Sequence, residues 1–288
     1  LDVLGGNDGF RFECLDIADR AAVEDLIAKH GDITRVVHLA SQAGVRYSLT
    51  DPYAYTHSNV EGHLVLMETC RTLARLDHFV YASSSSVYGG NTKLPFSIKD
   101  PVDKPLSVYA ATKRSMELFA HSYSHIYTMP LTGLRFFTVY GPWGRPDMMP
   151  WIFTQKILKG EPIPVFNNGE MSRDFTYVDD IVRGIVACLD GPPGDDGATK
   201  PGGSVAPHAL YNIGNNRSEE LMRVIGIIEA ACGRKAQIEL LPMQKGDVPR
   251  TFADIDAIAR DHGFQPETSA DEGFPRFVSW FKAYHGID

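Results

Sequence analysis

Along residues 11–140, short apolar runs rich in β-branched and aromatic residues alternate with longer stretches whose apolar positions recur every three to four residues. The short runs have the length of strands, and the longer stretches have the periodicity of amphipathic helices. This alternation favours right-handed crossovers and therefore an α/β fold, in which a doubly wound parallel sheet is covered by helices on both faces. The predicted strands are FECLDI (12–17), TRVVHLA (34–40), HFVYASS (78–84) and LTGLRFFTVYG (131–141), and the predicted helices are AAVEDLIAKHG (21–31), PYAYTHSNVEGHLVLMETCRTLA (52–74) and SVYAATKRSMELFAHSYSHIY (107–127).

The pattern loosens after residue 145, where Pro- and Gly-rich connections separate four predicted helices. We therefore expect two units, a sheet domain at 1–145 and a smaller α/β lobe at 146–288, with the chain crossing back between them. Residues 191–207 are rich in turn formers and predict a mobile surface loop. The four helices are predicted near 150–159, 178–189, 218–232 and 273–285.

Composition narrows the class of partner. The 288 residues carry 28 Lys and Arg against 36 Asp and Glu, a formal net charge of -8, and the cations are dispersed. This argues against a nucleic-acid or anionic-membrane surface and favours a small-molecule ligand. The four cysteines stand apart, without a paired cysteine or a histidine at metal-ligand spacing, so neither a disulfide framework nor a metal site is predicted. Reduced thiols and the lack of a membrane-length apolar run predict a cytoplasmic protein.

The segments of chemical interest in this half of the chain are found at the carboxyl ends of three predicted strands. They lie at residues 39–41, 83–86 and 137–138. Ligands of parallel α/β sheets bind beyond the carboxyl ends of the strands. The sequence therefore predicts a binding site where these three segments meet.

Tyr109 and Lys113 lie one helical turn apart in YAATK, on the same face of a predicted helix. A tyrosine is a weak base at its ordinary pKa, about 10, but a neighbouring ammonium and a cationic ligand lower that value. Tyr109 could then act as a general base near neutral pH. The alternative is a helix-end tyrosine beside a solvated lysine, but the hydroxyl cluster one crossover upstream favours the catalytic interpretation.

The combination of SVYG (86–89) with YAATK (109–113) resembles the extended short-chain dehydrogenase/reductase family of sugar-nucleotide epimerases and dehydratases. The resemblance continues in family order over nearly the whole chain, and within the family HLA-x-QAGVRYS (38–48) and GGNTKLPF (89–96) are most similar to UDP-glucuronate 4-epimerases. It implies a Rossmann-like domain that binds NAD, and a UDP-sugar substrate. The other matching segments are LRFFTVYGPWGRPDM (134–148), RDFTYVDDIVRGI (173–185), YNIGN (211–215) and GDVPRTFADI (246–255).

The serines indicate which reaction the resemblance implies. The family places a hydroxyl at Ser84 that works with Tyr109 on the sugar 4-OH. Dehydratases and decarboxylases carry a carboxylate at the position of Ser86, and dehydratases carry another at Ser85. Serines cannot replace those acids and bases efficiently, so 4-epimerisation through a 4-keto sugar is favoured. The alternatives are a UDP-glucose 4-epimerase, an inactive sugar-nucleotide-binding form and a related decarboxylase or dehydratase.

Further site residues follow from the resemblance, position by position. Lys113 also holds the nicotinamide ribose, and Ser85 and Ser86 could bind a C6 carboxylate. Arg46 and Arg145 are candidates for an acidic sugar, although each could instead pair with a neighbouring carboxylate such as Asp147. Asp16 and Ile17 match the adenine contacts; Leu39, Ala40 and Ser41 match the turn along the cofactor diphosphate; Phe136 matches the aromatic near the nicotinamide; and Thr138, Arg173 and Asp247 match positions facing the sugar or the nucleotide.

The family's first strand and its G-x-x-G-x-x-G turn are not found in these 288 residues. We expect the natural protein to carry that unit; the alternative is a true truncation, in which dinucleotide affinity should collapse. The resemblance also implies a homodimer through the helices carrying residues 52–76 and 107–127.

Overall fold

The central element of the computed structural model is a four-stranded parallel sheet with the order β1-β2-β3-β7. The structure describes residues 4–244 and 246–287. Val37 pairs with Val80, and Ser83 pairs with Arg135 in the next strand. The α/β class with a parallel sheet is thereby confirmed. The strands are β1 (Arg35–His38), β2 (His78–Ser84), β3 (Leu131–Phe136), β4 (Thr138–Tyr140), β5 (Pro162–Val165), β6 (Ser172–Tyr177), β7 (His208–Ile213), β8 (Ser218–Glu220) and β9 (Gln237–Leu240).

Helices cover both faces of this sheet. On one face α3 and α4 pack over β2 and β3 through Met67, Met116 and Phe79, and on the other α6 and α8 pack against β2 and β7 through Ile181 and Ile258. Strand β2 is buried at all seven positions, because both of its faces are covered. The α-helices are α1 (Arg20–Lys29), α2 (Pro52–Tyr55), α3 (Gly62–Cys70), α4 (Val108–Tyr127), α5 (Met149–Lys159), α6 (Val178–Asp190), α7 (Leu221–Cys232), α8 (Asp256–His262) and α9 (Ala270–His285), and the short turns are η1 (Tyr47–Leu49), the π-helical η2 (Thr56–Glu61), η3 (Ser85–Tyr88) and η4 (Asn167–Gly169).

The predicted strand at residues 12–17 is wrong. The segment is not a strand, and Phe12 and Cys14 are exposed. A strand forms only where a neighbour supplies its ladder hydrogen bonds, and the one strand paired with β1 in the described residues is β2. Helix α1 begins after this segment, where the Asp19 side chain accepts a hydrogen bond from the amide of Ala22 at 3.1 Å.

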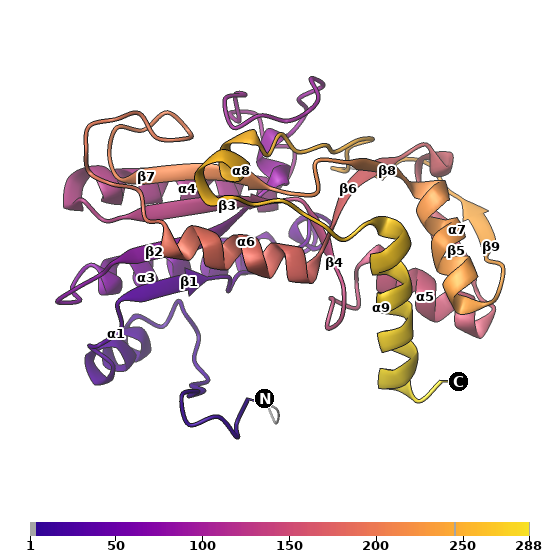
Figure 1. Ribbon diagram of the computed structural model, residues 1–288, viewed down its shortest axis with the longest axis horizontal. Coiled ribbons are helices and arrows are strands. Elements are labelled where there is room, and N and C mark those ends of the chain that lie inside the picture. The colour runs from indigo at the N-terminus through magenta and orange to yellow at the C-terminus, as the bar shows by residue number, and fades with distance from the viewer. Residues whose placement is uncertain (1–3, 245, 288) are drawn as a thin grey trace.

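A second hydrophobic cluster lies away from the central sheet. Helices α5, α7 and α9 pack with the parallel pair β5–β9, and Figure 1 shows this group beside the sheet domain. A small sheet of order β4-β6-β8 lies between the two groups. Strand β7 comes from the second half of the chain but joins the first sheet. The boundary at residues 145 and 146 itself stays a prediction.

All three tryptophans of the chain gather in the second group. Trp143 and Trp151 flank Trp280 of α9, with ring centroids 5.5 and 5.8 Å from it.

Residues 191–207, all described, contain no helix or strand. No helix in the described part of the chain is both long and apolar enough to span a bilayer.

Candidate active site

A cavity of about 700 Å³ opens at the carboxyl ends of β2 and β3, facing the second group of helices. Its size is that of a small-molecule site. Residues of all three segments predicted to meet at this edge lie on its wall, namely Ser41, Ser83–Ser86 and Phe137–Thr138. The predicted residues on its wall are Ser41, Arg46, Ser84, Ser85, Ser86, Tyr109, Lys113, Phe136, Thr138, Arg145, Arg173 and Asp247.

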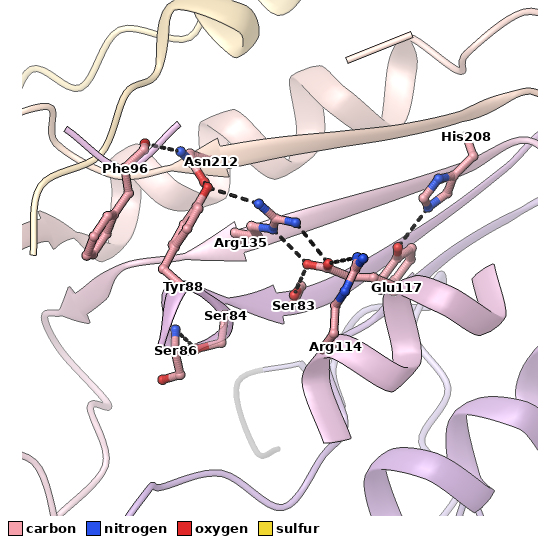
Figure 2. A network of polar contacts seen from close by, with 11 residues as sticks. Ser83, Ser84, Ser86, Tyr88, Phe96, Arg114, Glu117, Arg135, His208 and Asn212 are labelled. Atoms are coloured by element: carbon pink, nitrogen blue, oxygen red, sulfur yellow. Dashed lines mark hydrogen bonds and ion pairs between the residues drawn. The ribbon is translucent and has the colours of Figure 1, made fainter. Parts of the chain in front are cut away.

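The serine run turns from strand to 3₁₀ helix at this wall. Ser84 is the N-cap of η3, and its hydroxyl accepts a hydrogen bond from the amide of Ser86 at 3.2 Å. The hydroxyl of Ser83 instead donates to the Glu117 carboxylate at 2.6 Å, as Figure 2 shows. Ser85 borders the cavity. Ser83 therefore holds a buried carboxylate of α4.

Helix α4 carries the predicted catalytic pair. It begins at the Ser107 cap, whose hydroxyl accepts a hydrogen bond from Ala110 at 3.1 Å. Tyr109 in its first turn is half-buried at the cavity wall. Lys113 is only 2% exposed, and its Nζ donates to the carbonyl of Ala82 at 2.7 Å and to Ser41 Oγ at 3.1 Å.

The protonation energetics differ from the expectation for this pair. Burial lowers the pKa of Lys113 to about 7. The pKa of Tyr109 is raised, because burial outweighs the lowering effects of a hydrogen bond with Ser84 and of the Arg145 charge. Lys113 turns its ammonium toward β2, so the neighbours that favour the phenolate here are Ser84 and Arg145. The expected lowering by Lys113 is therefore not found in the protein alone.

Three arginines line the cavity. Arg145 donates from Nε to Asp147 at 2.9 Å, and Arg173 donates from Nη2 to Asp247 at 2.7 Å. Arg46 lies over the ring of Phe166 at 5.0 Å from its centroid. The alternative considered for Arg145, a pair with Asp147, is thus present in the structure. The two predicted nucleotide contacts, Arg173 and Asp247, also pair with each other.

The loop that precedes α2 is held by two side chains that the sequence reasoning missed. The Asn59 amide bonds both backbone groups of Gln42, at 2.8 and 3.0 Å, and donates to Thr112 of α4 at 3.0 Å. The hydroxyl of Tyr55 donates to the carbonyl of Gly44. The sequence does not single out Asn59, because it stands among the polar residues Thr56, His57 and Ser58, and its π-helical turn cannot be recognised from residue types.

Four of the predicted cofactor contacts do not lie on the cavity wall. Asp16 pairs with His57 at 2.9 Å, and Ile17 packs close to Gly62. Leu39 and Ala40 are exposed at the end of β1. The roles of Asp16, Ile17, Leu39 and Ala40 stay predictions.

Comparison with known proteins places these features in a family. Residues 2–214 match the sequence model of the NAD dependent epimerase/dehydratase family. A probable UDP-glucuronate 4-epimerase of Rhizobium meliloti is 45% identical over 285 residues, which cover 97% of this chain and 83% of the relative. UDP-glucuronate 4-epimerase 4 of Arabidopsis thaliana is 47% identical over 259 residues, which cover 88% of this chain and 59% of that protein.

Solved structures give the same result. The UDP-glucuronic acid 4-epimerase of Bacillus cereus, in complex with UDP-glucuronic acid and NAD, superposes with a TM-score of 0.87 at 32% identity. The match covers 98% of this chain and 85% of that one. A UDP-glucose 4-epimerase of Thermotoga maritima, with UDP-glucose, has a TM-score of 0.85 at 28% identity and covers 97% of this chain and 86% of its own.

Proposed function

Because this chain belongs to the NAD-dependent epimerase/dehydratase family, we propose that it interconverts UDP-glucuronate and UDP-galacturonate by epimerisation at C4. The observation that carries the proposal is the convergence of Ser84, Tyr109 and Lys113 on one cavity in which positions 85 and 86 are serines. The UDP-glucuronate 4-epimerases named among its relatives support the choice of substrate.

The residues of the site are suited to one reversible proton transfer. NAD, when bound, supplies the acceptor and donor for the C4 hydride, so that the sugar passes through a 4-keto form with no net oxidation. Tyr109 takes the proton of the 4-OH and returns it after the keto sugar has turned over. Ser84 hydrogen-bonds the same oxygen and favours the phenolate of Tyr109.

The residues present fit the nicotinamide end of NAD. The Lys113 ammonium has three hydrogens, and two of them serve Ala82 and Ser41. The third is available to a ribose hydroxyl at the cavity, and Phe136 adds an apolar wall beside it. A lysine buried this completely is costly, and a site for a polar ligand explains its position.

The charges of the cavity suit an anionic substrate. Lys113 and three arginines face two carboxylates, Asp147 and Asp247, and each carboxylate is paired with an arginine. The described part of the wall therefore offers no carboxylate free to expel a C6 hydroxyl or take a C5 proton. This disfavours a dehydratase, and it leaves a UDP-glucose 4-epimerase as the nearest alternative.

The test is incubation of the purified protein with NAD and either UDP-glucuronate or UDP-glucose, followed by chromatographic separation of the epimers. Formation of UDP-galacturonate, lost in Tyr109→Phe, is expected. Turnover of UDP-glucose alone would instead favour the neutral sugar. Release of carbon dioxide or of a 6-deoxy-4-keto product would contradict the proposal, and the absence of any product would leave only a sugar-nucleotide-binding protein.

We further propose that the protein is a homodimer. Leu118 and Ile126 lie two turns apart on the outer face of α4, with exposed fractions of 53% and 64%, and Tyr53 of the neighbouring α2 is also exposed. An apolar surface of this kind is typical of an interface. Light scattering of the wild-type protein should give twice the monomer mass, and light scattering of Leu118→Glu should give the monomer mass.

We also propose that the protein works in the cytoplasm. The buried free thiols Cys70, Cys188 and Cys232 support this proposal.

A further inference from the structure

A buried carboxylate lies one helical turn beyond the catalytic pair. Glu117 follows Lys113 by four residues and Tyr109 by eight, so all three project from the same face of α4. Glu117 is 1% exposed, and the mechanism above does not use it. A carboxylate in the core is costly unless donors surround it. Its partners therefore indicate what it holds in place.

Glu117 accepts four hydrogen bonds, from two strands and from its own helix. Arg135 of β3 donates from Nε at 2.8 Å and from Nη2 at 2.9 Å, which makes a bidentate pair. Ser83 of β2 donates at 2.6 Å, and Arg114 of α4 donates at 2.9 Å. Burial opposes the charge, but Arg135 and the other donors outweigh it and lower the pKa of Glu117. The carboxylate is thus ionised and joins α4 to both strands.

The network continues to the far end of the serine segment, as Figure 2 shows. Arg135 Nη1 donates to the hydroxyl of Tyr88 at 3.0 Å, and Tyr88 donates to Asn212 of β7 at 2.6 Å. Asn212 in turn donates to the carbonyl of Phe96 at 2.8 Å. The segment that carries Ser84, Ser85 and Ser86 is therefore held at residue 83 by Glu117 and at residue 88 by Arg135.

We propose that the Glu117–Arg135 pair is a positioning element of the reaction, which fixes α4 against the serine segment and so sets the distance from Ser84 to Tyr109. This inference rests on the proposed function. An apolar pair of similar volume would stabilise a core as well as or better than a buried ion pair. What the ion pair adds is direction, because a bidentate contact permits only a narrow range of rotation and translation of the helix.

Two variants and one matched control separate positioning from stability. Glu117→Gln keeps the volume of the side chain but loses its charge, and Ser83→Ala removes one donor with less disturbance. The control is Thr132→Val, which breaks a buried hydrogen bond of 2.8 Å between Thr132 and His78 at the opposite end of the same two strands. The melting temperature of each protein is measured first. Its kcat, its KM and the pH dependence of kcat are then measured with UDP-glucuronate at one temperature at which all of the proteins are folded.

We expect Glu117→Gln to lower kcat on the order of 100-fold with a small change of KM, because misplacement of reacting groups by about 1 Å has an effect of this size. Ser83→Ala should lower it less. In both, the pH of half-maximal kcat should move upward, because a looser Ser84–Tyr109 contact favours the phenolate less. Thr132→Val should have a lower melting temperature than the wild type, but the pH of its half-maximal kcat should not move.

The inference is overturned if Ser83→Ala and Glu117→Gln keep the wild-type pH profile and lose no more kcat than Thr132→Val does at an equal loss of melting temperature. If Glu117→Gln fails to fold, Ser83→Ala decides alone. An ultraviolet difference titration, each protein minus its Tyr109→Phe counterpart, gives the pKa of Tyr109 without turnover. If the wild type has no epimerase activity the proposed function fails, and the titration still tests whether Glu117 controls Tyr109.

Discussion

Replacement of Lys113 by methionine is expected to stabilise the protein while it abolishes turnover. Burial lowers the pKa of this ammonium from 10.5 to about 7. At about 1.36 kcal/mol per pKa unit, the charged form of Lys113 destabilises the native state by about 5 kcal/mol relative to the unfolded chain. Methionine has a similar length, and it forfeits the hydrogen bonds to Ala82 and Ser41, worth about 1 kcal/mol each. The expected net gain in the free energy of unfolding is about 2–3 kcal/mol at neutral or lower pH.

The gain should fall as the pH rises. The pKa of Lys113 is lower in the native state than in the unfolded chain, so between pH 7 and 10.5 the unfolded chain binds a proton that the native protein has released. The free energy of unfolding of the wild type therefore rises with pH across that window. The destabilisation by the buried Lys113 ammonium is fully present only below about pH 7. The difference between Lys113→Met and wild type should accordingly shrink by about 1.36 kcal/mol per pH unit above pH 7.

Urea unfolding of the dinucleotide-free proteins, followed by circular dichroism at about pH 6 and about pH 9, measures both quantities. Lys159→Met, at an exposed lysine near the end of α5, is the matched control and should change little at either pH. The reasoning is refuted if Lys113→Met is no more stable than wild type at the lower pH, or if its gain is the same at both.

Three further predictions concern the reaction and the core. Tyr109→Phe should lower kcat by about 10²- to 10⁴-fold at unchanged melting temperature, because it removes the general base; a smaller loss in steady-state assays would exclude that role. Arg145→Gln should raise KM for UDP-glucuronate by about 10- to 100-fold, the equivalent of one charged hydrogen bond, with little effect on UDP-glucose; equal effects on both sugars would show that it does not read the carboxylate. Gly133→Ala should lower the free energy of unfolding by about 1–3 kcal/mol in urea titrations, because a Cβ there would lie 2.5 Å from the hydroxyl of Tyr81 and 2.6 Å from Leu210; an unchanged value would mean that this part of the core can give way.

Strands β2 and β3 could be predicted from the sequence because they are buried almost throughout and appear as continuous apolar runs. Strand β1 could also be predicted, although only His38 in it is fully buried. Strand β7 completes the same sheet and is not among the predicted strands. The small strands could not be predicted either. Strand β8 is only SEE. Strand β9 (QIEL) alternates polar and apolar residues over just four positions and is exposed at all of them, so neither strand gives a strong signal in the sequence. Their pairing is set by tertiary contacts of β6 and β5. Residues 12–17 show the converse, since an apolar run does not become a strand without a neighbour to pair with.

The candidate site likewise contains residues that a local sequence pattern reveals and residues that it does not. Tyr109 and Lys113 could be found because a helix fixes the geometry of residues four apart. Glu117 is one more turn along the same face, but nothing local indicates that its partners are Ser83 and Arg135, more than 15 residues away in the chain. Buried polar residues acquire their roles from such distant partners, and a single sequence does not reveal them.

The gathering of all three tryptophans in one group of helices determines what the protein's intrinsic fluorescence can report. Trp143 borders the cavity, whereas Trp151 and Trp280 are not on its wall: Trp280 belongs to α9, and Trp151 of α5 packs against it. Emission should therefore follow ligand binding at the rim and melting of the second group, and it should be nearly blind to the parallel sheet. If the two groups unfold separately, fluorescence and circular dichroism will give different midpoints, and their difference measures how tightly the two halves of the fold are coupled.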